Sequence, residues 1–115
     1  MGADFTKVNP PKPEDGRSSA EALREAVEAG GRTGIICSGG TSQDAVSFLQ
    51  GLHDQIHLGG AVGNATGRNI HQRPLDEALR LCSAVSAVTV GLVDVDTAVR
   101  IYEGQETWSL PQVSL

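Results

Sequence analysis

Three short segments of the sequence carry side chains that could perform chemistry. Lys7 stands inside the apolar run 5–8, the turn Ser38-Gly39-Gly40-Thr41 follows the apolar run 34–38, and Gly67-Arg68-Asn69 follows a third run. In parallel α/β folds, ligands bind beyond the carboxyl ends of the strands. If the three runs are parallel strands, the three segments therefore share one edge of a sheet.

Lys7 is the candidate nucleophile. Side chains alternate along a strand, so Phe5, Lys7 and Asn9 are expected on one face. On the inner face of a barrel, partial loss of water would favour the neutral amine, which is the form that attacks a carbonyl group. The alternative is a lysine on an edge strand that points to solvent, and position alone does not decide between the two.

The two glycine turns are candidate anion sites. Adjacent glycines let the backbone approach an anion closely, and a helix beginning at Thr41 or Ser42 would add free N–H groups and a favourable dipole. Arg68 could hold phosphate oxygens through two parallel hydrogen bonds. Either turn alone could simply be a tight connection that needs small residues. Together, at the same end of adjacent strands, they favour a phosphate site.

Two other polar pairs are assigned no role in chemistry. His53 and His57 stand four residues apart on a predicted helix, which suits a metal pair, but no nearby carboxylate or cysteine completes a ligand set. We therefore predict no metal site. Asp94 and Asp96 lie at the start of the last predicted helix, where helix capping explains them.

The elements that must position these residues alternate between strands and helices. Strands are expected at residues 4–8, 34–38 and 61–66, and residues 67–71 form a turn or one helical turn. Ser18 and Glu21 form a capping-box pair at the start of the first helix. Apolar stripes define the buried helix faces: Ala20, Leu23 and Val27; Ala45, Leu49, Leu52 and Ile56; Leu75, Leu79, Cys82 and Val85; Val95, Ala98, Val99 and Tyr102. This alternation predicts a parallel sheet with right-handed crossovers.

Composition excludes several classes of function. The net charge is −5, so most of the surface would repel nucleic acid phosphates. No apolar run approaches the roughly 20 residues that cross a bilayer, and the first residues lack the pattern of a secretory signal. A cytoplasmic location follows, with Cys37 and Cys82 expected as two buried thiols in a reducing compartment.

With these segments in place, the chain resembles the C-terminal part of the archaeal-type class I fructose-bisphosphate aldolase family, which includes autoinducer-2 phosphate thiolase-like members. The segment 2–8, Gly-Ala-Asp-Phe-Thr-Lys-Val, resembles the sixth barrel strand, whose lysine forms a Schiff base. The segment 36–40, Ile-Cys-Ser-Gly-Gly, resembles the seventh strand and its phosphate-binding turn. The segment 66–72, Thr-Gly-Arg-Asn-Ile-His-Gln, resembles the end of the eighth strand.

The resemblance implies a fold, a substrate class and a set of residues. The fold is the C-terminal portion of a (β/α)8 TIM barrel, strands six to eight with their helices, over residues 1–104, followed by an irregular tail at 105–115. Lys7 would be the Schiff-base nucleophile, and the reaction would need no cofactor and no metal. The substrate would be a phosphorylated sugar. Its phosphate would be held by Ser38, Gly39, Gly40, Gly67 and Arg68.

The family takes its acid and base residues from the first five strands, which have no counterpart in these 115 residues. We therefore expect a piece of an aldolase with little or no turnover of its own. The alternative is a non-catalytic truncated half-barrel that binds phosphate or assembles with a partner chain. Three parallel strands leave two open edges, which a homo-oligomer would cover.

Overall fold

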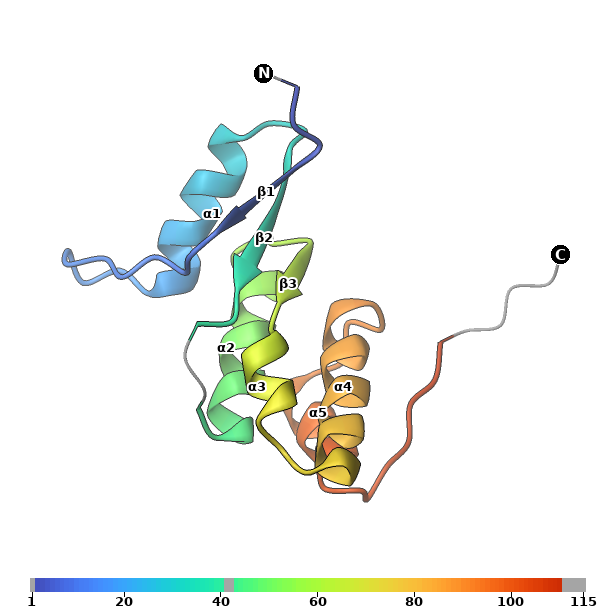
Figure 1. Ribbon diagram of the computed structural model, residues 1–115. Coiled ribbons are helices and arrows are strands. Elements are labelled where there is room, and N and C mark those ends of the chain that lie inside the picture. The colour runs from blue at the N-terminus through green and yellow to red at the C-terminus, as the bar shows by residue number, and fades with distance from the viewer. Residues whose placement is uncertain (1, 41–42, 111–115) are drawn as a thin grey trace, which may run out of the picture.

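The computed structural model describes residues 2–40 and 43–110 (Figure 1). The elements within them are β1 (Phe5–Val8), α1 (Ser19–Ala29), β2 (Gly34–Ser38), α2 (Ala45–His57), β3 (Gly63–Ala65), α3 (Gly67–His71), α4 (Leu75–Thr89) and α5 (Val95–Tyr102). The predicted alternation of strands and helices is confirmed. The third strand is shorter than expected at both ends: the Ala61 amide bonds to the Gln55 carbonyl of α2, and Thr66 is already the N-cap of α3.

The three strands form one parallel sheet in the order β1-β2-β3. Lys7 pairs with Ile36 of the central strand, and Ser38 pairs with Ala65 of β3. The carboxyl ends of all three strands therefore lie at the same edge of the sheet, as predicted. This is the strand arrangement of part of a (β/α)8 barrel.

The two faces of the sheet have different surroundings. On one face Ile35 and Cys37 are buried with Leu23 of α1, and Val8 packs against the same cluster. On the other face Phe5 is 63% exposed. Helices therefore cover only one face of the described sheet.

The main core lies among α2, α4 and α5, at the opposite end of the molecule from α1 (Figure 1). The predicted α2 stripe is confirmed, with Leu49 fully buried and Leu52 2% exposed. Leu81 of α4 and Ala98 of α5 are also fully buried in this cluster. Full burial of a leucine side chain is worth about 1.5–3 kcal/mol, so this cluster is the main source of hydrophobic stabilisation.

The buried face of α4 was predicted wrongly. Leu75 is 75% exposed, Leu79 is 60% exposed, and Cys82 is exposed. Of the predicted stripe only Val85 is buried; the other buried residues of α4 are Ala78, Leu81, Ala84, Ala87 and Val88. The helix has apolar residues on more than one face, and packing against α2 and α5 selects the face that carries Leu81. The prediction of two buried thiols consequently holds for Cys37 and fails for Cys82.

Helix caps fix the entry points of the helices. The Ser18–Glu21 capping box of α1 is present as predicted. The cap of α2 is Asp44, whose carboxylate accepts a hydrogen bond from the Ser47 amide at 2.9 Å, whereas the predicted caps Thr41 and Ser42 lie outside the described residues. Helix α2 therefore begins further along the chain than expected.

The last described residues, 105–110, contain no helix or strand. Trp108 nevertheless packs against the main core, so this segment is not detached from the helical part; the rest of the expected tail lies outside the described residues. None of the helices in the part of the chain that the structure describes combines the length and hydropathy that would cross a membrane.

Candidate functional site

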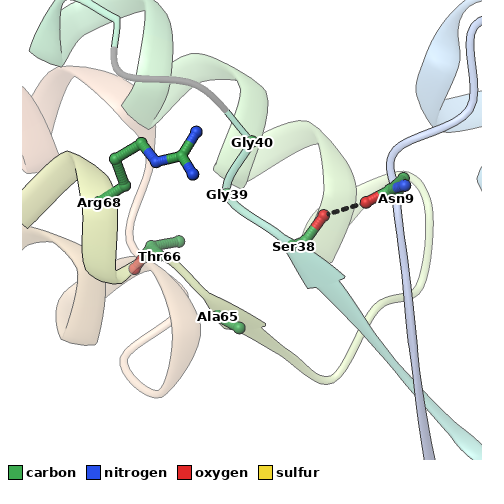
Figure 2. A pocket seen from close by; sticks show the side chains of 7 residues that line it. All are labelled: Asn9, Ser38, Gly39, Gly40, Ala65, Thr66 and Arg68. Atoms are coloured by element: carbon green, nitrogen blue, oxygen red, sulfur yellow. Dashed lines mark hydrogen bonds between the residues drawn. The ribbon is translucent and has the colours of Figure 1, made fainter.

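A pocket of about 380 Å³ opens at the carboxyl ends of β2 and β3. Figure 2 shows the residues that line it: Asn9, Ser38, Gly39, Gly40, Ala65, Thr66 and Arg68. Of the residues predicted to hold phosphate, the structure brings together Ser38, Gly39, Gly40 and Arg68. Gly67 begins α3 between two lining residues but does not itself line this pocket.

The two glycines of the β2 turn have different reasons to be glycine. A Cβ atom on Gly39 would lie 2.9 Å from the Cα atom of Thr66, so the close approach of the two turns requires the absence of a side chain. Gly40 has φ of +66°, a conformation that other residues rarely adopt. The Gly39 amide already donates to the Ala65 carbonyl at 2.7 Å. Gly39 therefore shapes the pocket, while its N–H is not available to a ligand in this arrangement.

Ser38 has a partner that the sequence did not indicate. Its hydroxyl donates to the Oδ1 atom of Asn9 at 2.7 Å, across the mouth of the pocket (Figure 2). The alternation of side chains predicted only that Asn9 shares a strand face with Lys7. To donate to a phosphate oxygen instead, the Ser38 hydroxyl must turn away from Asn9.

Arg68 lies on α3 with its side chain extended toward Gly40 (Figure 2). The residue is exposed, and within residues 2–40 and 43–110 no hydrogen bond or ion pair engages its guanidinium. Arg73, on the segment that follows α3, is by contrast engaged by carbonyl and carboxylate groups. Arg68 is therefore the arginine at this pocket whose donors are free to hold an anion.

Lys7 is exposed and does not line this pocket. Its neighbour Val8 packs into the cluster under α1, so Lys7 points to the opposite, uncovered face. Because β1 is at the edge of the sheet, the structure matches the second alternative, an edge-strand lysine in contact with solvent. The expected partial loss of water from Lys7 does not occur within the described chain, since only the other face is covered.

Electrostatics at the start of α2 oppose a simple helix-dipole site. The Asp44 carboxylate lies at this helix end, and hydrogen bonds from Ser47, first from its backbone N–H, lower the pKa of Asp44. Asp44 therefore places a negative charge where an anion would otherwise meet free amides. The positive charge for an anion must come from Arg68 instead.

The two histidines of α2 stack on each other, with ring centroids 4.0 Å apart. They are partly buried, which differs from the solvent edge suggested by their neighbours in sequence. In the stretches that the structure describes, no three His, Cys, Asp or Glu side chains gather closely enough to hold a metal ion.

Sequence reasoning missed a buried polar residue directly behind the pocket. Asn69 is fully buried, and its side-chain amide bonds to the carbonyl of Gly39 and to the amide of Gln43. The sequence placed Asn69 in the Gly-Arg-Asn segment but predicted no burial and no hydrogen-bond partner for it. A fully buried asparagine beside a glycine turn is the kind of signal that only the fold reveals.

Comparison with known proteins places this arrangement among aldolases. The DeoC/LacD family aldolase pattern matches residues 1–73. A fructose-bisphosphate aldolase/6-deoxy-5-ketofructose 1-phosphate synthase from Methanocaldococcus jannaschii is 50% identical over 104 residues, which is 90% of this chain. A class 1 fructose-bisphosphate aldolase from Halobacterium salinarum is 33% identical over 98 residues, or 85% of this chain.

A solved structure of a fructose-bisphosphate aldolase from Slackia heliotrinireducens is also similar. It superimposes with a TM-score of 0.91 at 56% sequence identity and covers 96% of this chain. The chain spans about a third of the length of these proteins: 33% and 34% of the two sequences, and 35% of the solved one.

Proposed function

The chain belongs to the DeoC/LacD family of aldolases, and we propose that it supplies the Schiff-base and phosphate-binding part of a class I aldolase that acts on a phosphorylated sugar. The relatives named above as fructose-bisphosphate aldolases support the reaction class. A cytoplasmic site of action fits Cys37 and Cys82, which are both free cysteines. The single observation that carries the proposal is the Arg68 guanidinium, which has no hydrogen bond or ion pair within residues 2–40 and 43–110 and extends toward Gly40 (Figure 2).

The pocket residues hold the phosphate in this proposal. Arg68 contributes charge and paired donors, and Gly40 contributes backbone that a ligand can approach closely. The Ser38 hydroxyl adds a further hydrogen bond once it leaves Asn9, and Gly67 lets α3 begin close to the ligand. Gly39 keeps the two turns in contact.

Lys7 carries the covalent chemistry. Its neutral amine attacks the carbonyl carbon of a ketose, and with the uptake of one proton water leaves and a protonated imine forms. The hydroxyl on the β-carbon then gives up its proton to a base or to solvent, and the bond between the α- and β-carbons breaks. The O–H electron pair forms the C=O bond of the released aldehyde, the carbon–carbon pair becomes the C=C bond of an enamine, and the C=N pair returns to the nitrogen. Protonation of the enamine carbon and hydrolysis of the imine release the second product and restore Lys7. The proposed sequence uses no cofactor and no metal.

The test is reductive trapping. The chain is incubated with dihydroxyacetone phosphate and sodium borohydride, and the adduct is located by intact mass and peptide mapping. An adduct on Lys7 that is lost in Lys7→Gln and retained in Lys12→Gln supports the proposal, because Lys12 is another exposed lysine in the loop after β1. Folded wild-type protein without any adduct on Lys7 contradicts it.

Turnover by the isolated chain is a separate expectation. With Lys7 exposed and the sheet covered on one face only, we expect little or no cleavage of fructose 1,6-bisphosphate. A coupled assay for the triose phosphate products measures this. Robust turnover by the purified chain would show that the described residues suffice for catalysis.

The exposed β1 strand favours one alternative function. Phe5 is 63% exposed on the uncovered face, and β1 is an open edge, so the chain is suited to assemble with a second copy or a partner chain. In this alternative the chain binds phosphate without catalysing a reaction. Light scattering tests the homo-oligomer: a stable monomer at micromolar concentration argues against it.

A further inference from the structure

We propose that Asn69 and Arg73 are positioning residues that hold Gly39 and Gln43, on either side of residues 41–42, in the positions that suit phosphate binding at the Gly39-Gly40 turn. The proposal rests on the phosphate site proposed above and adds two residues to it that do not touch the ligand. It starts from the way in which the connection between β2 and α2 is fastened at both ends. Its beginning, Gly39, and its end, Gln43, are both bonded to the segment that follows β3.

Asn69 joins the two ends directly. Its Nδ2 atom donates to the Gly39 carbonyl at 3.3 Å, and its Oδ1 atom accepts from the Gln43 amide at 3.1 Å. The residue is fully buried. Since a buried amide that loses its partners carries a desolvation cost, the Asn69 side chain holds Gly39 and Gln43 in fixed positions relative to α3.

Arg73 completes the fastening from the end of α3. Its Nε atom donates to the Asn69 carbonyl at 2.8 Å, and one terminal nitrogen donates to the Gln43 carbonyl at 2.7 Å. Both backbone polar groups of Gln43 are therefore engaged, the N–H by Asn69 and the carbonyl by Arg73. Through its bond to the Asn69 carbonyl, the Arg73 guanidinium also fixes the backbone of Asn69, whose side chain bonds to Gly39.

The contacts on Arg73 distinguish it from the ligand-binding arginine. The second terminal nitrogen of Arg73 donates to the Glu77 carboxylate at 3.1 Å, and the Arg73 side chain is 15% exposed. All three of its nitrogens thus have protein partners, and it does not line the phosphate pocket. Arg68, by contrast, is exposed and points to Gly40 (Figure 2). One arginine offers donors to the ligand, and the other holds the backbone.

The fastening continues into the main core. Glu77 of α4 accepts a hydrogen bond from the Tyr102 hydroxyl of α5 as well as the bond from Arg73. Tyr102 packs against the main core. The turn is thereby connected through Asn69, Arg73 and Glu77 to the part of the molecule with the most buried apolar surface.

The consequence for binding is preorganisation. A phosphate needs the Gly39-Gly40 turn and Arg68 in fixed relative positions, and ordering a loose turn upon binding would reduce affinity. Removing the Asn69 amide should therefore weaken phosphate binding by roughly tenfold, which corresponds to the net contribution of about one buried hydrogen bond. The change removes no group that touches the ligand.

The experiment compares three variants of the chain by titration with inorganic phosphate and by amide hydrogen exchange. Asn69→Ala and Arg73→Lys are the test variants. Arg80→Lys is the matched control, since Arg80 also donates from Nε to a carbonyl, that of Tyr102 at 2.8 Å, but lies away from the turn. The expected result is weaker phosphate binding and faster Gln43 exchange in both test variants only. The Ser47 amide, bonded to Asp44, should exchange at the wild-type rate in all three.

A second readout separates positioning from general loosening. Trapping of Lys7 by borohydride is compared for dihydroxyacetone phosphate and for dihydroxyacetone, which lacks the phosphate. The test variants should lose the advantage of the phosphorylated ketone and keep trapping of the unphosphorylated one. Equal losses for both ketones would mean general loosening and would overturn the proposal.

The outcomes also separate this proposal from the proposed function. If wild-type protein binds no phosphate, the phosphate site itself is refuted, and with it any positioning role for phosphate. If wild-type binds phosphate but both test variants match Arg80→Lys in affinity and in Gln43 exchange, the site stands and the positioning role of Asn69 and Arg73 is overturned.

Discussion

Lys7 and Gly39 lie at neighbouring strands of one sheet, yet the chain surrounds them very differently. The turn at Gly39 is backed by a fully buried asparagine and connected through Glu77 to the main core. The strand with Lys7 is an edge strand whose outer neighbour positions are open, and Phe5 on the same face is 63% exposed. Residues 39–40 thus form a fastened turn, and β1 (Phe5–Val8) is an open strand.

The difference concerns what each kind of chemistry needs. A phosphate site needs fixed donors and one free positive charge, which residues 38–73 supply among themselves. A Schiff-base lysine needs a neutral amine, which is favoured when water is excluded from around it. The open strand excludes no water on the face of Lys7. The comparison therefore predicts that this chain retains phosphate binding at the fastened turn more fully than it retains Schiff-base chemistry at the open strand.

The largest expected difference between the two regions is in stability. Leu81→Ala removes a fully buried side chain from the core behind the fastened turn, and we expect a loss of about 2–5 kcal/mol in the free energy of unfolding. Phe5→Ala on the open strand should change it by about 0.5 kcal/mol or less in the monomer. Urea unfolding followed by circular dichroism measures both. Equal losses would show that the open strand is buried in solution.

The two halves of the site should also separate in their functions. Arg68→Gln removes the free charge, and we expect phosphate affinity to fall by about 1.5–3 kcal/mol, the worth of a hydrogen bond to a charged group, while trapping of dihydroxyacetone on Lys7 is unchanged. Lys7→Gln should abolish trapping and leave phosphate affinity within error. Calorimetric titration and borohydride trapping of both variants test this. Loss of both functions in either variant would contradict the separation.

Sequence patterns predicted the parts of this fold that local chemistry determines. The three parallel strands, the Ser18–Glu21 capping box and the stripe through Leu49 and Leu52 follow from periodicity and caps, and all are present. The buried face of α4 could not be read in the same way. That helix has apolar residues on several sides, and its buried face is chosen by α2 and α5, which approach it from distant parts of the chain.

The candidate site, like the fold, was predicted only in the features that follow from local sequence. Small residues and Arg68 after two strands indicated that two turns meet, and they do. The bonds that fasten the turn join residues 26 and 30 apart in sequence, Gln43 with Asn69 and Gln43 with Arg73, which no spacing rule covers. Whether the face of Lys7 is covered depends on neighbouring strands, so the sequence left both alternatives open.

A smaller effect is expected from the packing of the turn itself. Gly39→Ala would bring a methyl group to 2.9 Å from the Thr66 backbone, and we expect a loss of roughly 1–3 kcal/mol, as for other overpacked sites, together with weaker phosphate binding. Gly51→Ala is the control, because its Cβ would meet no atom within 4 Å in the middle of α2. That change should stabilise the chain by about 0.5–1 kcal/mol. Thermal unfolding distinguishes the two, and an equal gain at Gly39 would mean that the turns do not touch.

The smallest effect is expected from pH, through the link between the fastened turn and α5. The Tyr102 hydroxyl and, next, Arg73 hold the pKa of Glu77 below its ordinary value of 4.5, while the same hydrogen bond raises the pKa of Tyr102 above 10.0. Ionised Glu77 therefore stabilises the fold above about pH 4.5, and this contribution is lost as the pH falls through the lowered pKa.

The alkaline side has the opposite sign for the same bond. Neutral Tyr102 contributes fully below pH 10 and loses its contribution as the pH rises through its raised pKa. Glu77→Gln should flatten the pH dependence of unfolding at both ends. Urea midpoints from pH 3 to 11 measure this, with phosphate affinity followed over the range where the variants stay folded. If the stability of Glu77→Gln fell with decreasing pH as steeply as that of the wild type, Glu77 would not belong to the series of hydrogen bonds that connects the fastened turn to α5.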